Sequence, residues 1–266
     1  MSGFSEEWLS AREPVDHAAR GRLILNEIAR FLEPLDRIKI ADIGTGTGST
    51  LRAIQPVISR PIDWHVIDND KALLDALSDT LRDNDAIKTS CTDLAVSTEP
   101  VFQNVPDLVT TSAFLDLVSK NWLSQLVAEL ALQKKPFYAA LTYDGRTQIS
   151  PCHPLDHVVL DHFNRHQKTD KGFGPSLGPG AAQTAIGLFE EAGFSVLQEP
   201  SDWVADFKHN RFQEMLLEGW RDAVVEIQPE LKVQFNAWYD ERMKFIADGS
   251  SKIRVGHIDF FAVPKA

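Results

Sequence analysis

Three glycines at alternating positions form the part of the sequence best suited to ligand chemistry. The stretch from Asp42 to Gly48 reads D-I-G-T-G-T-G, follows a short apolar run and precedes a segment, 49–54, with the pattern of a helix start. Glycine has no Cβ and adopts positive φ, so a ligand can lie against bare backbone there. A helix that begins after such a turn presents unpaired N–H groups to polar or anionic atoms. The pattern therefore predicts a nucleotide-binding turn between a strand and a helix.

The glycine spacing separates two kinds of nucleotide site. A dinucleotide fingerprint has the form G-x-G-x-x-G, which would place its third glycine at position 49. That position holds Ser49, and the pattern is instead G-x-G-x-G with the acid Asp42 two residues before Gly44. This spacing disfavours a dinucleotide site.

A second group of residues could move protons or orient a substrate. In the expected helix 154–167, His162 and His166 fall within the apolar face, so they are the histidines expected to face the protein interior as a base or an orienting group. The alternative is that they are core histidines with ordinary hydrogen bonds. Asp144, directly after an expected strand, could abstract a proton or hold an amine, with a surface turn as the alternative. The stripes of His, His and Asp in this region permit a metal geometrically, but solvated stripes are commoner and we expect no metal site.

The elements that must position these residues alternate between strand and helix. Expected strands span 38–43, 62–67, 86–91, 107–111, 137–143, 194–198 and 253–263, and expected helices span 15–33, 70–82, 119–132 and 181–192. This alternation predicts an α/β fold: a Rossmann-like, seven-stranded, mostly parallel sheet with helices on both faces. In such sheets the ligand sits at the carboxyl ends of the strands.

The expected domain organisation is a single domain over residues 1–266. Its core would comprise about 35–143, 181–200 and 251–264. Two helical or loop insertions, about 145–180 after the fifth strand and 202–250 after the sixth, would cap the substrate site. Within the first, the Gly- and Pro-rich segment 171–180 is expected to be either a lid or an ordinary connection.

Together, the glycine motif and the acids at strand ends resemble class I S-adenosylmethionine-dependent methyltransferases. The resemblance is good over about 38–143 and looser beyond. It implies that the glycine turn contacts the methionine and ribose of S-adenosylmethionine, that Asp68 binds the ribose hydroxyls, and that Asn69 and Asp93 border the adenine. It also implies that Thr111 and Ser112 lie beside the reactive methyl, and that Arg20 could meet the cofactor carboxylate, a solvated helix face being the alternative. The cofactor-binding residues expected on this basis are Arg20, Asp42, Gly44, Thr45, Gly46, Gly48, Asp68, Asn69, Asp93, Leu94, Thr111 and Ser112.

Composition bears on the class of methyl acceptor and on the cellular compartment. The net charge of −11 disfavours nucleic acid, because an acidic surface repels phosphate. The Asn-Pro-Pro-Tyr type of motif that amino-methylating nucleic-acid enzymes use is absent, so a small-molecule acceptor is favoured. The two cysteines give no disulfide framework, and we find neither a leader pattern nor an apolar run long enough to span a membrane. We therefore expect a cytoplasmic protein without a membrane partner, and leave a homodimer open.

Two other functions stay in view. One is a non-catalytic, regulatory protein that binds S-adenosylmethionine. The other is an NAD(P)-dependent oxidoreductase, which the glycine spacing disfavours and for which we find no Tyr-x3-Lys pair. The favoured function is methyl transfer to a small molecule by in-line displacement.

Overall fold

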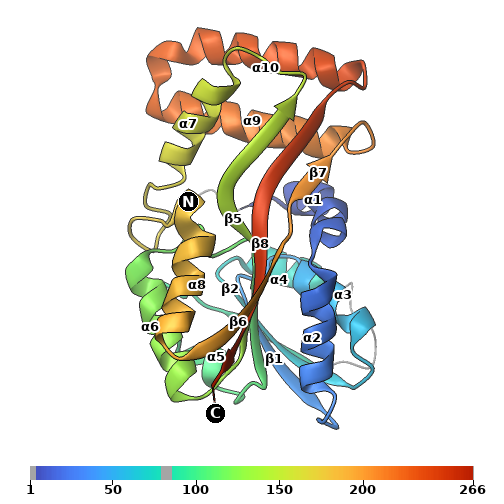
Figure 1. Ribbon diagram of the computed structural model, residues 1–266, viewed down its shortest axis with the longest axis vertical. Helices are drawn as coiled ribbons and strands as arrows, with labels where there is room; N and C mark the ends of the chain where they lie inside the picture. Colours follow the sequence, from blue (N-terminus) through green and yellow to red (C-terminus); the bar gives the residue numbers. More distant parts are fainter. Residues whose placement is uncertain (1–3, 79–85, 266) are drawn as a thin grey trace.

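One mostly parallel sheet organises the protein. The structure, a computed structural model, describes residues 4–78 and 86–265. The strand order is β3-β2-β1-β4-β5-β8-β6, with β7 pairing with β8 beside this path (Figure 1). β8 is antiparallel to both β5 and β6, while the strands from β3 to β5 are all parallel. The strands are β1 (Ile38–Ile43), β2 (Ile62–Asp68), β3 (Ala86–Cys91), β4 (Leu108–Ser112), β5 (Phe137–Ser150), β6 (Phe194–Pro200), β7 (Trp203–Ala205) and β8 (Lys252–Pro264).

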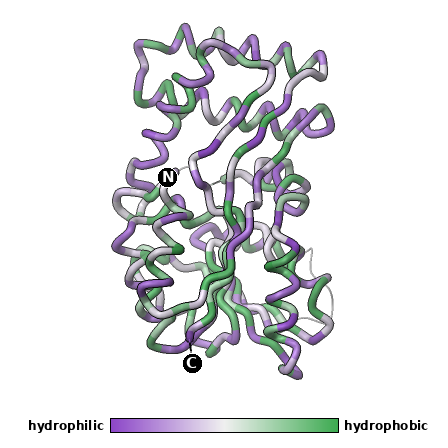
Figure 2. Tube along the Cα trace, viewed as in Figure 1, coloured by the Kyte–Doolittle hydropathy of each residue, from purple (hydrophilic) through white to green (hydrophobic). Residues whose placement is uncertain are grey.

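The predicted α/β class with a mostly parallel sheet is confirmed, although the strands number eight among the described residues rather than seven. The added strand, β7, is three residues long and lies inside the expected second insertion. β1 lies between β2 and β4, and of its residues only Lys39 is exposed. Such near-continuous burial is typical of parallel strands covered on both faces. Figure 2 shows the apolar strands running through the lower, sheet-containing part of the molecule.

Helices cover both faces of the sheet. One face packs against α2, α3 and α4, and the other against α5, α6 and α8. The helices are α1 (Glu6–Ala19), α2 (Arg22–Leu32), α3 (Ser49–Ile54), α4 (Lys71–Ser78), α5 (Glu99–Phe102), α6 (Lys120–Leu132), α7 (Asp156–His166), α8 (Ala181–Glu191), α9 (Asn210–Ile227) and α10 (Lys232–Ala247). The expected end of the helix over 70–82 lies outside the described residues. No helix in the described ranges has the length and apolarity to cross a lipid bilayer.

The first expected helix, 15–33, was wrong as a single element. The chain bends at Arg20 and Gly21, so that α1 ends at Ala19 and α2 begins at Arg22. The N–H of Gly21 donates to Oδ2 of Asp259 (3.0 Å) instead of continuing the helix. A Cβ at Gly21 would lie 2.4 Å from Oε2 of Glu199, so a larger residue there would displace the Glu199 side chain, which accepts from the N–H of Leu23 (3.1 Å) at the start of α2. The partners in these contacts are far from Gly21 in the sequence, so a helical pattern of apolar residues cannot predict the bend.

The two long strands β5 and β8 carry the upper part of the molecule. β5 was expected to end near residue 143, but it continues to Ser150 through two register shifts, after Ala139 and after Tyr143. At the first shift Leu141 has φ 51°, and its N–H donates to Oδ1 of Asp259 (2.7 Å). Bulges of this kind bend a strand and increase its twist. The extended strands lead up to α7, α9 and α10, which form a layer above the sheet (Figure 1).

Helices from the two insertions pack together in this layer. Asp156 of α7 accepts hydrogen bonds from Nε1 of Trp238 (2.9 Å) and from Arg242, both in α10. Phe163 of α7 lies with its ring centroid 5.6 Å from that of Trp220 in α9. The two insertions, about 80 residues apart in the chain at this contact, therefore form one unit above the sheet.

Candidate functional site

A cavity of about 1240 Å³ lies between the carboxyl edge of the sheet and the helices above it. Pockets for one drug-sized ligand are typically about 300–1,000 Å³, so this cavity has room for two small molecules. We call its lower part the glycine-turn half, lined by Gly44, Thr45, Gly46, Asp68, Asn69, Thr92, Leu94, Ser112 and Phe114. The upper half is lined by Arg12, Asp16, Asp116, Tyr143, Phe163, Trp203, Leu216, Trp220 and His257.

The glycine turn has the backbone that its sequence predicts. Gly44, Gly46 and Gly48 have φ of 62°, 54° and 85°. A Cβ at Gly44 would lie 2.7 Å from the ring of Phe114, and one at Gly48 would lie 2.3 Å from Cδ1 of Leu77. Gly44 and Gly46 line the cavity, whereas Gly48 does not and instead allows α3 to start close to α4.

Asp68 meets the glycine turn directly. Its Oδ2 accepts a hydrogen bond from the N–H of Gly46 (2.8 Å), and its Oδ1 accepts one from the N–H of Asp70 (3.0 Å). Each carboxylate oxygen keeps a further lone pair, and the side chain lines the cavity. A carboxylate held in this way can accept hydrogen bonds from two neighbouring hydroxyl groups of a ligand.

Asp42 lies beneath the turn and does not line the cavity. Its carboxylate accepts from the hydroxyls of Thr45 (2.5 Å) and Thr110 (2.6 Å), and the side chain is completely buried. Burial raises the pKa of Asp42 to about 6, against the opposing effect of these two hydroxyls. Asp42 therefore fixes the turn and β4 relative to each other from within the core.

The remaining expected cofactor residues divide into two sets. Asn69, Leu94, Thr45 and Ser112 line the cavity. Asp93 and Thr111 do not: Oδ1 of Asp93 accepts from the N–H of Ala95 (2.9 Å), and the buried hydroxyl of Thr111 donates to the carbonyl of Ile43 (2.8 Å). Thr92, adjacent to Asp93, is the residue at that strand end that lines the cavity. The sequence pattern therefore predicted Asp93 as a binding residue and did not predict Thr92.

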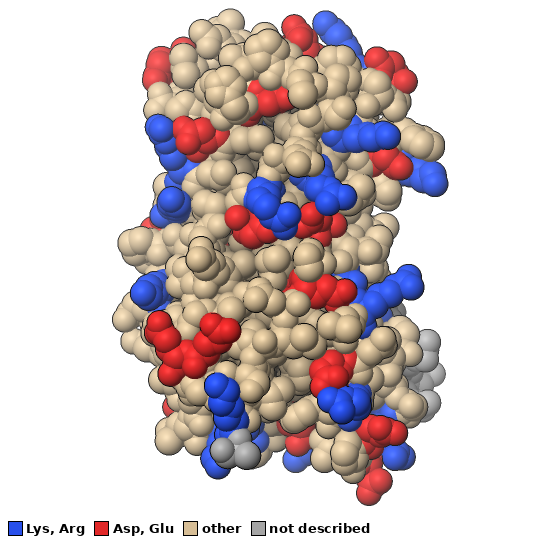
Figure 3. Space-filling model, in the orientation of Figure 1, with Lys and Arg blue, Asp and Glu red and all other residues tan. Residues whose placement is uncertain are grey.

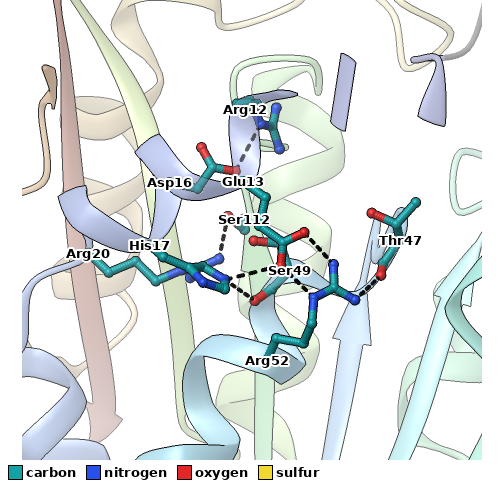
Figure 4. A network of polar contacts seen from close by, with 9 residues as sticks. All are labelled: Arg12, Glu13, Asp16, His17, Arg20, Thr47, Ser49, Arg52 and Ser112. Atoms are coloured by element: carbon teal, nitrogen blue, oxygen red, sulfur yellow. Dashed lines mark hydrogen bonds and ion pairs between the residues drawn. The ribbon is translucent and has the colours of Figure 1, made fainter. Parts of the chain in front are cut away.

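Helix α1 is fastened over the glycine turn (Figure 4). Nη2 of Arg52 donates to Oε2 of Glu13 (2.7 Å), and Nη1 of Arg52 donates to the carbonyl of Thr47 (2.6 Å). Nε2 of His17 lies 3.2 Å from the carbonyl of Ser49, to which it can donate. α1 therefore closes one side of the cavity with contacts to the turn itself.

The arginine that lines the cavity from this helix is Arg12 rather than Arg20. Arg20 is buried at the bend after α1, where Nη2 donates to Oγ of Ser112 (3.2 Å) and Nη1 to the hydroxyl of Tyr138 (3.5 Å). Nε of Arg12 donates to Oδ2 of Asp16 (2.9 Å), and among the described residues its two terminal nitrogens donate no hydrogen bond. They are free to meet a ligand group, and Figure 4 shows this guanidinium and its partner Asp16 side by side on α1.

Three titratable groups that the sequence did not single out face the upper half: Asp116, Tyr143 and His257. Burial raises the pKa of Asp116 to about 6, with Arg12 opposing this effect, and raises the pKa of Tyr143 to about 12. His257 is 3% exposed, and burial lowers its pKa to about 3, so the ring is neutral near pH 7. Nδ1 of His257 lies 3.1 Å from the carbonyl of Val255 and must donate to it, which leaves Nε2 as an acceptor.

Of the three catalytic candidates from the sequence, one lines the cavity. Asp144 does not line the cavity, and its carboxylate pairs with Arg146. His162 also lies off the cavity, with its ring 6.0 Å from that of Phe235 in α10. His166 does line the cavity, near its rim, where Nε2 lies 3.1 Å from Oε2 of Glu226. In addition, among the described residues no group of three or more His, Cys, Asp or Glu is arranged to hold a metal ion.

The segment 171–180 braces the loop that carries Asp116. The N–H of Gly178 donates to the carbonyl of Asp116 (2.9 Å), and Oγ of Ser176 donates to the carbonyl of Leu117 (2.8 Å). Phe173 packs edge-on against Trp122, with ring centroids 5.2 Å apart. These contacts hold the loop after β4 in place beside the cavity.

Comparisons with known proteins find the fold but no close relative. No family model and no curated protein matches the chain. Among solved structures, a cyclopropane-fatty-acyl-phospholipid synthase-like protein from Lactobacillus casei is similar with a TM-score of 0.57 and 12% identity, over 97% of this chain and 94% of that one. A cyclopropane synthase from Mycobacterium tuberculosis matches with a TM-score of 0.51 and 14% identity, over 98% and 94% of the two chains. An S-adenosylmethionine-dependent methyltransferase from Geobacter sulfurreducens, in complex with S-adenosyl-L-homocysteine, matches with a TM-score of 0.50 and 13% identity, over 100% of both chains. The chain thus has the Rossmann-like fold of S-adenosylmethionine-dependent methyltransferases.

Proposed function

We propose that this protein is an S-adenosylmethionine-dependent methyltransferase that acts on a small molecule. The observation that carries the proposal is the contact between Asp68 and the N–H of Gly46 at the floor of a cavity large enough for two ligands. The fold shared with methyltransferases, one of them complexed with S-adenosyl-L-homocysteine, supports the same cofactor.

The residues of the glycine-turn half fit this cofactor. Gly44 and Gly46 leave no side chain between ligand and backbone, and Asp68 suits a ribose with two adjacent hydroxyls. Asn69, Thr92 and Leu94 are in position to border the adenine. From the upper half, Arg12 can reach toward this cofactor: its guanidinium lies 5.6 Å from the centroid of the Trp203 ring, and its terminal nitrogens suit the cofactor carboxylate, since guanidinium and carboxylate pair in a bidentate way. When bound, S-adenosylmethionine supplies a methyl carbon on a sulfonium, which is displaced in line by the acceptor.

We further propose that the chain acts as a single unit, in which the two insertions roof the acceptor. Phe163 from the first insertion and Trp220 from the second line the same cavity. A roof of this kind excludes water and orients the acceptor, which is the main contribution that a protein makes to such a displacement. On the face drawn in Figure 3, Lys and Arg side chains are interleaved with Asp and Glu and form no continuous basic area, which agrees with a small acceptor rather than nucleic acid.

The alternatives make different predictions for ligand binding. Calorimetric titration with S-adenosylmethionine, S-adenosyl-L-homocysteine and NAD tests the cofactor, and we expect saturable binding of the first two and none of NAD. Binding of NAD alone would favour the oxidoreductase. Cofactor binding without methyl release on a panel of metabolites would favour the non-catalytic, regulatory function.

A further inference from the structure

The upper half of the cavity combines aromatic walls with one carboxylate that has no partner side chain. The walls include Tyr143, Phe163, Trp203 and Trp220. Asp116 reaches this space from the loop after β4, and among the described residues its carboxylate accepts no hydrogen bond from another residue, its side chain being half-buried.

The cation that acts on Asp116 is shared with a second acid. Arg12 is the nearby cation, but Nε of Arg12 is already paired with Asp16 at 2.9 Å, and Asp16 is 1% exposed. Of the other groups that face this space, Tyr143 and His257 are neutral near pH 7 because burial raises the pKa of the first and lowers that of the second. Burial raises the pKa of Asp16, against the opposing effect of Arg12 and Arg20. With both acids ionised, Arg12, Asp16 and Asp116 together carry a net negative charge.

The rim of the cavity has the same sign. Among the described residues that line the whole cavity, three are Lys or Arg and eight are Asp or Glu. The basic residue at the rim, Lys171, lies beside His166 and Glu226. A cleft lined by one sign of charge raises the local concentration of ligands of opposite charge. The acidic residues that line the cavity are Asp16, Asp68, Asp70, Asp116, Asp170, Glu218, Asp222 and Glu226.

A second polar group points to a ligand that donates hydrogen bonds. Nδ1 of His257 is taken by the carbonyl of Val255, so that the neutral ring offers Nε2 as an acceptor from a side chain that is 3% exposed. The ring lies 4.4 Å from that of Trp203 and 5.9 Å from that of Tyr143, centroid to centroid. Arg12 already lies over Trp203, 5.6 Å from its ring centroid. Apart from Arg12, the upper half presents acceptors and the aromatic side chains Tyr143, Phe163 and Trp220, a combination that suits an ammonium group.

We propose that the methyl acceptor is an organic amine with an aromatic or apolar body, and that Asp116 binds its ammonium group and takes its proton. This inference rests on the proposed methyltransferase function. Loss of the proton to Asp116 frees the nitrogen lone pair, which forms the new bond to the methyl carbon. The carbon–sulfur bond breaks with its electron pair left on sulfur, and the methylated amine carries the positive charge that the sulfonium loses. Asp116 returns its proton to solvent when the products leave.

The test measures binding to the protein saturated with S-adenosyl-L-homocysteine, by calorimetry at pH 7. The probes share one body and differ in charge: phenethylamine, phenethyl alcohol and hydrocinnamate. We expect phenethylamine to bind at least tenfold more tightly than the alcohol, as expected of a partly buried ion pair. In Asp116→Asn this preference should fall below about twofold, while the affinity for S-adenosyl-L-homocysteine stays within about twofold.

The control is Asp161→Asn, which removes one negative charge from the exposed surface of α7, where Asp161 pairs with Arg165 at 2.9 Å. It should keep the preference for the amine. Equal binding of the three probes, no binding of phenethylamine, or a preference that survives Asp116→Asn would overturn the proposal. Failure of the wild-type protein to bind S-adenosyl-L-homocysteine would instead refute the cofactor assignment. Retained binding of this compound by Asp116→Asn also shows that the variant is folded.

Discussion

The two halves of the cavity are built in different ways. The glycine-turn half comes from short segments that each follow a parallel strand, such as Gly44–Thr47 after β1 and Asp68 at the end of β2. The upper half combines α1, the loop after β4, the extensions of β5 and β8, and helices from both insertions. The ends of the parallel strands position most of the first half, whereas the second depends on packing between distant elements. We therefore expect substitutions in the lower half to act on cofactor affinity, and those in the upper half, other than at Arg12, to act on acceptor binding and turnover.

The largest effect is expected at Asp116. With phenethylamine as acceptor, Asp116→Asn should lower kcat/KM by about 10²–10⁴-fold, the usual contribution of a general base. Because burial raises the pKa of Asp116 to about 6 and the base must be ionised, wild-type kcat/KM should fall as the pH drops below about 6. Steady-state rates measured between about pH 5 and 8, on both sides of that pKa, give the profile. The other titratable groups that line the upper half are Arg12, Asp16, Tyr143 and His257. A loss of rate at acid pH that persists unchanged in Asp116→Asn would assign this pH dependence to another group.

The next effect concerns the glycine turn. In Gly44→Val, a β-branched side chain would have to adopt φ near 62° with its Cβ against the ring of Phe114. Left-handed backbone costs about 1–2 kcal/mol and overpacking about 1–3 kcal/mol, so keeping the turn in its binding conformation costs about 2 kcal/mol or more, and cofactor affinity should fall by about thirtyfold or more. Gly187→Ala in α8 is the matched control, because an added Cβ there meets nothing within 4 Å. Calorimetry with S-adenosyl-L-homocysteine checks both, and normal binding by the valine variant would show that the ligand does not use this turn.

A tenfold effect is expected at the end of β2. Asp68→Ala should weaken S-adenosylmethionine binding by at least tenfold, about 1.4 kcal/mol, because it removes the acceptor of two ribose hydroxyls. Asp93→Ala is the informative partner, since Asp93 follows the next strand but bonds to the N–H of Ala95 and does not line the cavity. Its affinity should stay within about twofold of wild type. Equal losses of cofactor affinity in the two variants would show that Asp93 does bind the adenine, as its position in the sequence suggests.

The smallest effect on turnover is expected at His162. Its ring packs near Phe235 and does not line the cavity, so His162→Ala should lower the stability by about 1 kcal/mol and leave kcat/KM within about twofold. Urea unfolding and steady-state rates measure the two quantities. A large loss of turnover at unchanged stability would restore the catalytic role that the helical pattern of α7 suggests.

What the sequence predicted correctly follows from local rules. Alternating strands and helices, the positive φ of Gly44 and the position of Asp68 all depend on residues close in the chain, so periodicity and turn chemistry are sufficient. The bend at Gly21 and the extension of β5 depend on a distant partner, Asp259.

The upper half was not predictable for the same reason. Asp116, Tyr143 and His257 come from three elements, and only the register of β5 with β8 brings Tyr143 opposite His257. On α7, the pattern of apolar residues gives the buried face but does not separate a side chain that packs against α10, such as His162, from one at the cavity, such as His166. One sequence signal for the upper half is the cluster of charged residues in α1. Arg12 pairs with Asp16, while Glu13 and His17 fasten the helix to α3 and the glycine turn.

The most direct test of the central claim is a crystal structure with S-adenosyl-L-homocysteine bound. We predict the ribose hydroxyls at Asp68, the backbone of Gly44 and Gly46 against the ligand, and its sulfur turned toward the upper half that contains Asp116. A ribose that does not touch Asp68, or a ligand that fills the upper half instead, would contradict the division of the cavity into a cofactor half and an acceptor half.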